Sequence, residues 1–553
     1  MLGSLTKYVK QYAAGAAMTL MVIVSVFLYT HNLGHSYITL WDESVHVNIV
    51  KNLSKHCCTP ILLPEYFNTD FRNWTDNNVW LHKPVLPFYI SAIFYKFFGG
   101  TLFAMRFPGV IFAELIGLLL FFLGKKYFNF WVGLAAAGLF LSNSYTFELV
   151  QGRQFSGLSD LTFAFFCLLG LWFLLQYQSS RKLVSLLGLS GSLAVAYYCK
   201  GGLVVLPFLA CTLETLFFYR TRQGVKNLFY AFVQFLILTI PGILYLAWRF
   251  PAEFSYEQAV QIAHVFSSVE YWGRPFDYYF TVYARDVFGI LLLLPILLAV
   301  IYGFISWRGN KKIFTFNLWV VCFILPLSLM VSKISNFIYG ALPVALILIT
   351  AVYWDWWERK LYSKLAVISL SVLVLYCLVH FNIFDIRMRI FLENSFWHRS
   401  VIPLTVIISG LLGYVIYRVI PKRFFENKIK LLIFLSLVCV VFVSARVNFI
   451  SSNNLPDTFN LQDSLRKTAK ELNGKVPDNS IFFINIPELV HGNLFFMYWS
   501  SFPSLEVYNF HPISFLLKEI PKNFPVYIIS TNQLKGYGRE KIVPTGYLYK
   551  VRQ

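Results

Sequence analysis

Long apolar runs separated by short polar connections make up most of the chain. Each run is close to the roughly 17–25 residues that a helix needs to cross a bilayer, so the pattern predicts about 13 spans. The expected spans are 12–30, 101–123, 131–150, 158–177, 184–199, 202–219, 228–249, 287–306, 314–331, 336–353, 365–381, 400–417 and 430–449. The run 85–98 is too short for a full span and predicts a partial or interfacial helix. The pattern indicates an α-helical polytopic membrane protein.

Two stretches depart from this pattern, a polar loop at about 31–100 and the tail 451–553. In the tail, apolar residues first recur at helical spacing, and short β-rich runs follow between turn residues. The expected elements are an amphipathic helix at 457–473 and strands at 480–486 and 526–530. We therefore expect a transmembrane domain at 1–450, which includes the polar loop, and a small α/β domain at 451–553.

Composition and charge support the membrane interpretation. The chain is 57% hydrophobic and only 13% charged, whereas a soluble domain carries about 25% charged residues. A net charge of +20 is also typical of nucleic-acid-binding proteins, but here every second loop carries at least two basic residues. These residues are Lys7, Lys10, Lys125, Lys126, Arg181, Lys182, Arg220, Arg222, Lys226, Arg308, Lys311, Lys312, Arg359, Lys360, Lys364, Arg418, Lys422, Arg423, Lys428 and Lys430. Such loops face the cytoplasm, so we expect membrane lipids, and not nucleic acid, around the chain.

This orientation places the N-terminus inside, and the polar loop and the tail outside. Several ionisable residues at helix ends then fall on the outer side. They are Asp42, Lys83, Arg153, Asp160, Lys200, His264 and Lys333. Ionisable groups at such positions normally face protein or water and often serve function. We therefore expect the chemistry of the chain on its outer face.

Each candidate also has a structural interpretation. Asp42 and Glu43 could cap the next helix and suit its dipole, or one of them could accept a proton from an acceptor hydroxyl. Lys83 could anchor at the interface, or it could bind phosphate, because the following Pro84 restricts its backbone. For Arg153 and Asp160 the structural interpretation is an ion pair or helix caps. For His264 it is an ordinary position on an amphipathic helix.

Known motifs for other chemistries are missing from the sequence. No G-x-x-x-x-G-K-[ST] stretch occurs, which argues against an ATP-driven pump, and no H-E-x-x-H stretch occurs. Cys57 and Cys58 are adjacent and lack zinc-site spacing. We therefore predict no metal site; a divalent metal ion is compatible with the expected chemistry but is not required by it.

Taken together, the motifs resemble a known family over about residues 1–350. The motifs are Trp41, Asp42 and Glu43 followed by His46; Leu81, His82, Lys83, Pro84, Leu86 and Pro87; Ala104 to Pro108; Ser159 and Asp160; Lys200 and Gly201; His264; and Ser332 and Lys333 with Tyr339. This arrangement resembles the GT-C membrane glycosyltransferases, in particular the branch of the lipid A aminoarabinose transferases and the protein O-mannosyltransferases. The remainder of the chain agrees in layout only.

The resemblance implies a hexosyl- or pentosyltransferase that uses a sugar on polyprenyl phosphate. It implies an acceptor that is lipid A, another glycan or a protein, and a location in the bacterial inner membrane with a cytoplasmic N-terminus and a periplasmic tail. The resemblance also implies roles for individual residues. Catalytic carboxylates are Asp42, Glu43 and Asp160, donor-phosphate ligands are Lys83, Arg153, Lys200 and Lys333, and substrate contacts are His46, His82, His264 and Tyr339. The relatives carry an acid where this chain has His82.

Inverting transfer is the mechanism that we expect. Asp42 would deprotonate the acceptor, and Lys83 would stabilise charge on the leaving polyprenyl phosphate. The main alternative is a transporter (flippase) of lipid-linked sugars or polysaccharides, and a third is a membrane scaffold whose tail binds a partner. A transporter places ionisable residues near the bilayer midplane, whereas here they collect at one surface, which favours an enzyme.

Overall fold

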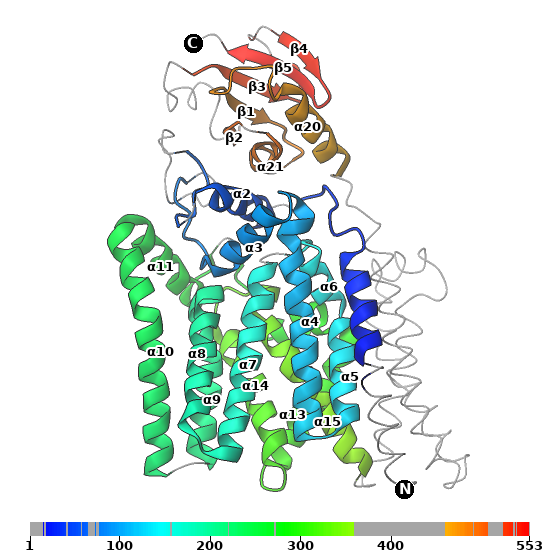
Figure 1. Cartoon of the computed structure of the whole chain (residues 1–553), viewed down its shortest axis with the longest axis vertical. Coiled ribbons are helices and arrows are strands. Elements are labelled where there is room, and N and C mark those ends of the chain that lie inside the picture. The colour runs from blue at the N-terminus through cyan, green and yellow to red at the C-terminus, as the bar shows by residue number, and fades with distance from the viewer. Residues whose placement is uncertain are drawn as a thin grey trace, which may run out of the picture.

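The structure is a computed structural model. It describes residues 15, 18–39, 42–56, 58–64, 72, 77–154, 157–218, 221–269, 272–358, 459–489, 491–500, 502–506, 524–534, 537 and 539–551. The predicted spans 365–381, 400–417 and 430–449 lie outside these residues. Figure 1 shows an upright bundle of helices with short surface helices at one end, and a small sheet beyond them.

The bundle consists of helices whose bounds follow the apolar runs. They are Met18–Thr30, α4 (Leu102–Tyr127), α5 (Phe130–Leu141), α6 (Ser144–Val150), α7 (Leu158–Ser180), α8 (Leu183–Lys200), η1 (Gly201–Val204), α9 (Val205–Phe218), α10 (Arg222–Arg249), α11 (Pro251–Phe266), α12 (Tyr278–Phe288), α13 (Ile290–Ile305), α14 (Lys311–Leu329), η2 (Ser335–Ala341) and α15 (Leu342–Glu358). The expected span 131–150 is divided into α5 and α6, because the Asn143 side chain accepts a hydrogen bond from the Thr146 N–H at 2.9 Å and begins a new helix.

Six stretches of the described residues are long and apolar enough to cross a membrane. They are Leu102–Tyr127, Leu158–Ser180, Leu183–Phe218, Arg222–Arg249, Lys311–Leu329 and Ser335–Trp356. Met18–Thr30, Phe130–Leu141 and Pro295–Ile305 are apolar but shorter. The helical membrane class is therefore confirmed, whereas the expected number of spans stays a prediction.

Close backbone contacts and a tight turn set the helices that lead to the site. A Cβ atom on Gly124 would lie 2.3 Å from the Cα of Gly133, so these glycines let α4 and α5 touch. Gly201 has a φ of +61°, which permits the sharp turn from α8 into α9. Lys200 is the last residue of α8 and therefore lies at this turn, beside the first turn of α7.

Two short helices, α2 (Asp42–Lys55) and α3 (Leu86–Phe97), lie at the end of the bundle nearest the sheet (Figure 1). α2 has acids in its first turn, where the helix dipole favours them, and a lysine in its last turn. α3 begins with a proline in its first turn. The structure thus confirms the short helix that the run 85–98 predicts.

The described residues of the tail form a five-stranded sheet with the helices α20 and α21. Its elements are α20 (Phe459–Leu472), β1 (Ile481–Asn485), α21 (Gly492–Trp499), β2 (Ser504–Glu506), β3 (Val526–Ser530), β4 (Arg539–Val543) and β5 (Gly546–Val551). The strand order is β2-β1-β3-β5-β4. β1 pairs in parallel with β2 and β3, and β5 pairs antiparallel with β3 and β4. Every residue of β3 is buried, which explains its uninterrupted apolar run.

The hydrophobic core of the sheet continues into the polar loop. One cluster of buried residues joins Val45 and Ile49 of α2 and Trp80 of the loop to Ile484 of β1 and Phe495 of α21. The helices of the bundle form a second cluster. The loop therefore packs with the tail through apolar contacts, and α2 lies between the sheet and the bundle.

Candidate active site

The first ion pair of the site lies within the polar loop and joins the segment around Lys83 to α2. The Lys83 ammonium contacts the Asp42 carboxylate, and these side chains are 19% and 16% exposed. Asp42 is the first residue of α2, and Lys83 precedes Pro84, which restricts its backbone to extended conformations. Both groups are thus held at fixed points and remain within reach of solvent or substrate.

The surroundings of Asp42 keep it ionised. Burial by itself raises the pKa of its carboxyl, but the Lys83 ammonium, with a smaller effect of His46, holds that pKa well below its usual range. Burial, followed by the charge of Lys83, lowers the pKa of His46 to about 3. The His46 ring is therefore neutral at physiological pH, and its Nε2 has no hydrogen-bond partner among the described residues.

A second ion pair lies at the ends of α7 and α8. The Lys200 ammonium contacts the Asp160 carboxylate and also donates to the carbonyl oxygen of Asn336 at 3.1 Å. The Asp160 side chain is 1% exposed, and its Oδ2 has no partner within the described part of the chain. Asp160 sits in the first turn of α7, where the helix dipole favours a negative charge.

The two pairs adjoin each other. A Cβ atom on Gly201 would lie 3.6 Å from Cγ of Pro84, so the residues that follow the two lysines lie next to each other. Lys200 is also close enough to Lys83 and Asp42 to interact with them electrostatically. Two lysines and two aspartates from distant parts of the sequence therefore converge at one end of the bundle.

Glu43 does not share this arrangement with its neighbour Asp42. Its Oε1 accepts a hydrogen bond from Nε of Arg106 at 2.7 Å, and its Oε2 accepts one from the Thr39 N–H at 2.7 Å. Burial raises the pKa of the Glu43 carboxyl, and Arg106 opposes this. The adjacent acids thus face different partners, and Glu43 anchors the loop to α4.

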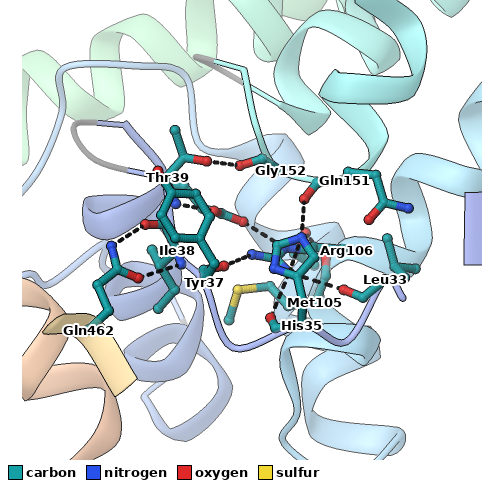
Figure 2. A network of polar contacts seen from close by, with 12 residues as sticks. Leu33, His35, Tyr37, Ile38, Thr39, Met105, Arg106, Gln151, Gly152 and Gln462 are labelled. Carbon is teal, nitrogen blue, oxygen red and sulfur yellow. Dashed lines mark hydrogen bonds and ion pairs between the residues drawn. The ribbon is translucent and has the colours of Figure 1, made fainter. Parts of the chain in front are cut away.

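Figure 2 shows how Arg106 organises the segment before α2. Its guanidinium donates to the carbonyl oxygens of Leu33 at 3.0 Å, His35 at 3.0 Å and Tyr37 at 2.7 Å. On the other side of the segment, the Gln462 side chain of α20 bonds to both the N–H and the carbonyl oxygen of Ile38. The approach to Asp42 is therefore fixed by the bundle and by the tail together.

Arg153 lies beside this anchor. The preceding Gly152 has a φ of +69°, and a Cβ atom there would lie 2.1 Å from Glu43 Oε1, so only glycine fits. Burial lowers the pKa of Arg153, and the charge of Glu148 opposes this. Arg153 also interacts electrostatically with Arg106 and Glu43, which places it on the Glu43 side of α2.

The predicted histidines flank Lys83. Nδ1 of His82 lies 3.0 Å from Oε2 of Glu257 on α11. His264, further along α11, is buried and packs edge-on against Phe337. Burial lowers the pKa of His264, and the nearby His82 adds to this. α11 therefore covers the loop that carries Lys83.

Two other predicted residues engage structural partners. The Lys333 ammonium donates to the carbonyl oxygens of Arg274, at 2.9 Å, and Met330. The Tyr339 side chain is fully buried, and its hydroxyl bonds to that of Thr146 at 3.1 Å. These contacts tie loops and helices together next to the Lys200 pair, since Asn336 lies between the two residues in sequence.

A small cavity of about 60 Å³ lies on the inner side of α2. Its lining includes Glu43 and His46 of α2, Phe88 of α3, Arg106 of α4 and Ser159 of α7. The Ser159 hydroxyl is buried and has no partner among the described residues. Within that same part of the chain, no cluster of three or more His, Cys, Asp or Glu residues could hold a metal ion.

Several residues that shape the site were not assigned roles from the sequence. Arg106 was visible only as part of a motif, and Glu257 and Gln462 only as polar positions on amphipathic helices. A buried charged residue requires a partner, so an arginine in the apolar run of α4 was the one usable signal. The partners of Glu257 and Gln462 are too distant in sequence for any spacing rule.

Comparisons with known proteins agree with this fold. The sequence model described as dolichyl-phosphate-mannose-protein mannosyltransferase matches residues 82–246. An uncharacterized protein of Aquifex aeolicus (strain VF5) is 26% identical over 365 residues, which are 64% of this chain and 68% of that protein. The segment of this chain that the family model matches includes Lys83, Asp160 and Lys200.

Solved structures match nearly the whole chain. The crystal structure of ArnT from Cupriavidus metallidurans bound to undecaprenyl phosphate superposes with a TM-score of 0.66 at 13% identity, and covers 96% of this chain and 97% of its own. The oligosaccharyltransferase AglB from Archaeoglobus fulgidus, in complex with an inhibitory peptide and a dolichol-phosphate, gives a TM-score of 0.51 at 12% identity, over 90% of this chain and 64% of its own. The chain has the fold of these GT-C membrane glycosyltransferases, and the resemblance drawn from its motifs is confirmed.

Proposed function

We propose that the chain is a glycosyltransferase that moves a sugar from a polyprenyl-phosphate donor to an acceptor at the outer face of the membrane. One observation carries the proposal: the Asp42–Lys83 and Asp160–Lys200 pairs meet at one end of the bundle. Two ammonium groups suit a phosphate, and a carboxylate beside them suits an acceptor hydroxyl. The undecaprenyl phosphate bound in the ArnT structure and the dolichol-phosphate bound in the AglB structure support a donor of this kind.

Donor binding changes the state of Asp42. Without substrate the carboxylate is neutralised by Lys83, and its pKa is too low for an effective base. A donor phosphate that accepts hydrogen bonds from Lys83 takes the ammonium away from Asp42. The pKa of Asp42 then rises, because its main stabilising charge is shared. The acid thus becomes a stronger base only when the donor is in place.

The reaction then proceeds by inversion. The acceptor oxygen attacks the anomeric carbon while Asp42 takes its proton, or a hydrogen bond if the acceptor is already anionic. The bond between the anomeric carbon and the phosphate oxygen breaks, and the electron pair leaves with polyprenyl phosphate. Lys83 and Lys200 stabilise the charge on that phosphate, so the leaving group requires no general acid.

The finer identity of the reactants belongs to this proposal. The sugar is a hexose or a pentose, and the acceptor is lipid A, another glycan or a protein. We place the chain in the bacterial inner membrane, with a cytoplasmic N-terminus and a periplasmic domain at 451–553. In support, α2, which begins with Asp42, lies at the end of the bundle nearest the sheet (Figure 1).

The described contacts do not favour the transporter alternative. Glu114 on α4 and Glu214 on α9 are buried carboxyl groups within apolar helices. Glu114 accepts a hydrogen bond from the Ser25 hydroxyl at 2.6 Å, and Glu214 accepts hydrogen bonds from the Thr315 hydroxyl at 2.7 Å and from Nε2 of Gln178. They lie on different helices with different partners, so they link helices and do not converge on a shared substrate site.

The test uses the purified full chain in detergent, where no membrane barrier exists. Transfer of sugar from synthetic polyprenyl-phosphate donors to lipid A, glycan and protein acceptors is followed by mass spectrometry. We expect Asp42→Asn to fold and to lose transfer by about 10²–10⁴-fold. The control Asp463→Asn removes a carboxylate on α20 that is held by Arg466 and Lys467 and leaves transfer intact. Full activity of Asp42→Asn contradicts the assignment.

A further inference from the structure

α11 reaches from the upper end of α10 toward the upper end of α8 and approaches the Lys83 loop (Figure 1). Glu257 of α11 is 4% exposed, and its carboxylate meets Nδ1 of His82 at 3.0 Å. One turn further, Nε2 of Gln261 donates to the carbonyl oxygen of His82 at 3.4 Å. Two side chains of one helix face therefore hold the residue immediately before Lys83.

The residue immediately after Lys83 is held as well. Pro84 packs against Gly201, next to Lys200. A peptide unit spans about 3.8 Å between Cα atoms, so anchors on both neighbours leave the Lys83 backbone little freedom. The reach of the ammonium is then set by where His82 and Pro84 are fixed.

The far end of α11 is tied to the second lysine pair. The N–H groups of Val331 and Ser332 donate to the carbonyl oxygens of Val265 and His264 at 3.0 and 3.1 Å. These residues lead into η2, whose Asn336 carbonyl accepts from Lys200. α11 thus spans the distance between the loop of Lys83 and the partner of Lys200.

We propose that Glu257 is a positioning residue, which through His82 holds Lys83 at the place where donor phosphate binds. This inference rests on the proposed function, because it assumes that Lys83 contacts phosphate. The alternative is that Glu257 only attaches α11 to the bundle. The buried residues of α11 are Glu257 and His264, whereas its Ile262 and Phe266 are exposed, so apolar packing contributes little to its attachment.

The experiment measures binding of undecaprenyl phosphate, without sugar, to the purified full chain. Glu257→Gln keeps the shape but removes the charge, so the bond to His82 loses its charge assistance. We expect the dissociation constant to rise by about tenfold. The matched control is Glu253→Gln, which removes the same charge one turn earlier on α11, where no contact with His82 exists among the described residues; it changes binding less than about twofold.

Exchanging the two residues tests whether their pairing is responsible for the effect on binding, and thermal melting reports whether α11 stays attached. The double variant of His82→Glu with Glu257→His rebuilds the pair in reverse, and we expect it to restore binding that either single change weakens. Thermal melting is measured on every variant. If Glu257→Gln binds like Glu253→Gln, or if the double variant binds as weakly as the singles while all melt alike, the proposal is wrong.

Lys83→Met distinguishes this failure from failure of the proposed function. We expect it to weaken undecaprenyl phosphate binding by at least the factor seen for Glu257→Gln, since the positioning effect acts through Lys83. Unchanged binding in Lys83→Met overturns the phosphate role itself. Weaker binding in Lys83→Met, together with unchanged binding in Glu257→Gln, overturns only the role of Glu257.

Discussion

The Lys83 ammonium has two competing anionic partners, the Asp42 carboxylate and the proposed donor phosphate. In the structure its ammonium neutralises Asp42, whereas the proposed reaction requires it to bind phosphate. A single lysine can therefore link arrival of the donor to the basicity of the acid. Asp160 and Lys200 repeat the pairing in a more buried setting, where the ammonium has a second acceptor in the Asn336 carbonyl. Lys200 is thus the more firmly fixed of the two lysines.

The buried histidines near Asp42 make the fold sensitive to acid. Burial lowers the pKa of His46 to about 3 and that of His491, at the start of α21, to about 4. In the unfolded chain a histidine binds its proton near pH 6.5. Between these values the unfolded state holds more protons than the native state, so stability rises with pH and is lost as the pH falls below about 6.5.

We expect His46→Asn to reduce this dependence. Each buried histidine contributes a slope of up to about 1.4 kcal/mol per pH unit between pH 6 and 4. The measurement is unfolding of the purified protein at several pH values in that range. The matched control is His56→Asn, because His56 follows the last turn of α2 and its side chain is exposed. Equal slopes in the wild type and His46→Asn contradict the prediction.

At the scale of the element, α2 is fixed by polar contacts on both of its sides. Toward the bundle, Glu43 pairs with Arg106. Toward the sheet, Nδ2 of Asn48 donates to the carbonyl oxygen of Leu494 at 2.7 Å. Nζ of Lys51 donates to the carbonyl oxygens of Met497, Tyr498 and Ser500 at 2.7–2.9 Å. A cation at the C-terminal end of α21 also suits the dipole of that helix.

Lys51 therefore connects the tail to α2. We expect Lys51→Met to weaken the attachment of the tail by roughly 2–3 kcal/mol, because carbonyl groups lose a charged donor. Limited proteolysis and hydrogen exchange of the tail measure the effect. Lys55→Met, on the next turn and exposed, is the control and leaves the protection unchanged. A tail that stays equally protected in Lys51→Met shows that the apolar packing and the hydrogen bonds of Asn48 and Gln462 attach it without Lys51.

At the scale of the molecule, α2 and α3 of the polar loop and the sheet of the tail all lie toward one end of the bundle (Figure 1). The predicted orientation places this end outside the cell membrane. Cys58 of the loop is exposed, whereas the described cysteines of the bundle, Cys167, Cys199, Cys211 and Cys322, are buried. His56 of the loop is exposed as well, so a cysteine introduced there reports the side on which the loop lies.

We expect a membrane-impermeant maleimide to label the His56→Cys variant from the periplasmic side of spheroplasts. Labelling is read by a mass shift, and the unmodified chain gives the background from its own cysteines. The reagent reaches position 56 before lysis if the loop is outside. Labelling that requires lysis reverses the orientation, and with it the proposed location of the active site.

The sequence predicts most of what depends on local pattern. The acids of Asp42 and Glu43 mark the start of α2, and the short run 85–98 predicts α3. The predicted lysines and aspartates do converge, because helix ends on one side of a bundle must share a surface. It could not be predicted that Asp42 faces Lys83 while Glu43 faces Arg106. A difference of about 100° around a helix separates these neighbours, and only the packing of α2 decides between them.

The two hydrogen bonds between Gln462 and Ile38 bear on the order in which the protein is made. These residues are 424 positions apart. Synthesis at about 5–20 residues per second separates their emergence by roughly 20–85 s. During that interval the segment before Asp42 lacks one of its two anchors, while the intervening helices enter the membrane. The candidate site is therefore completed only after nearly the whole chain has been translated, and a truncated product carries Asp42 on an unfinished support.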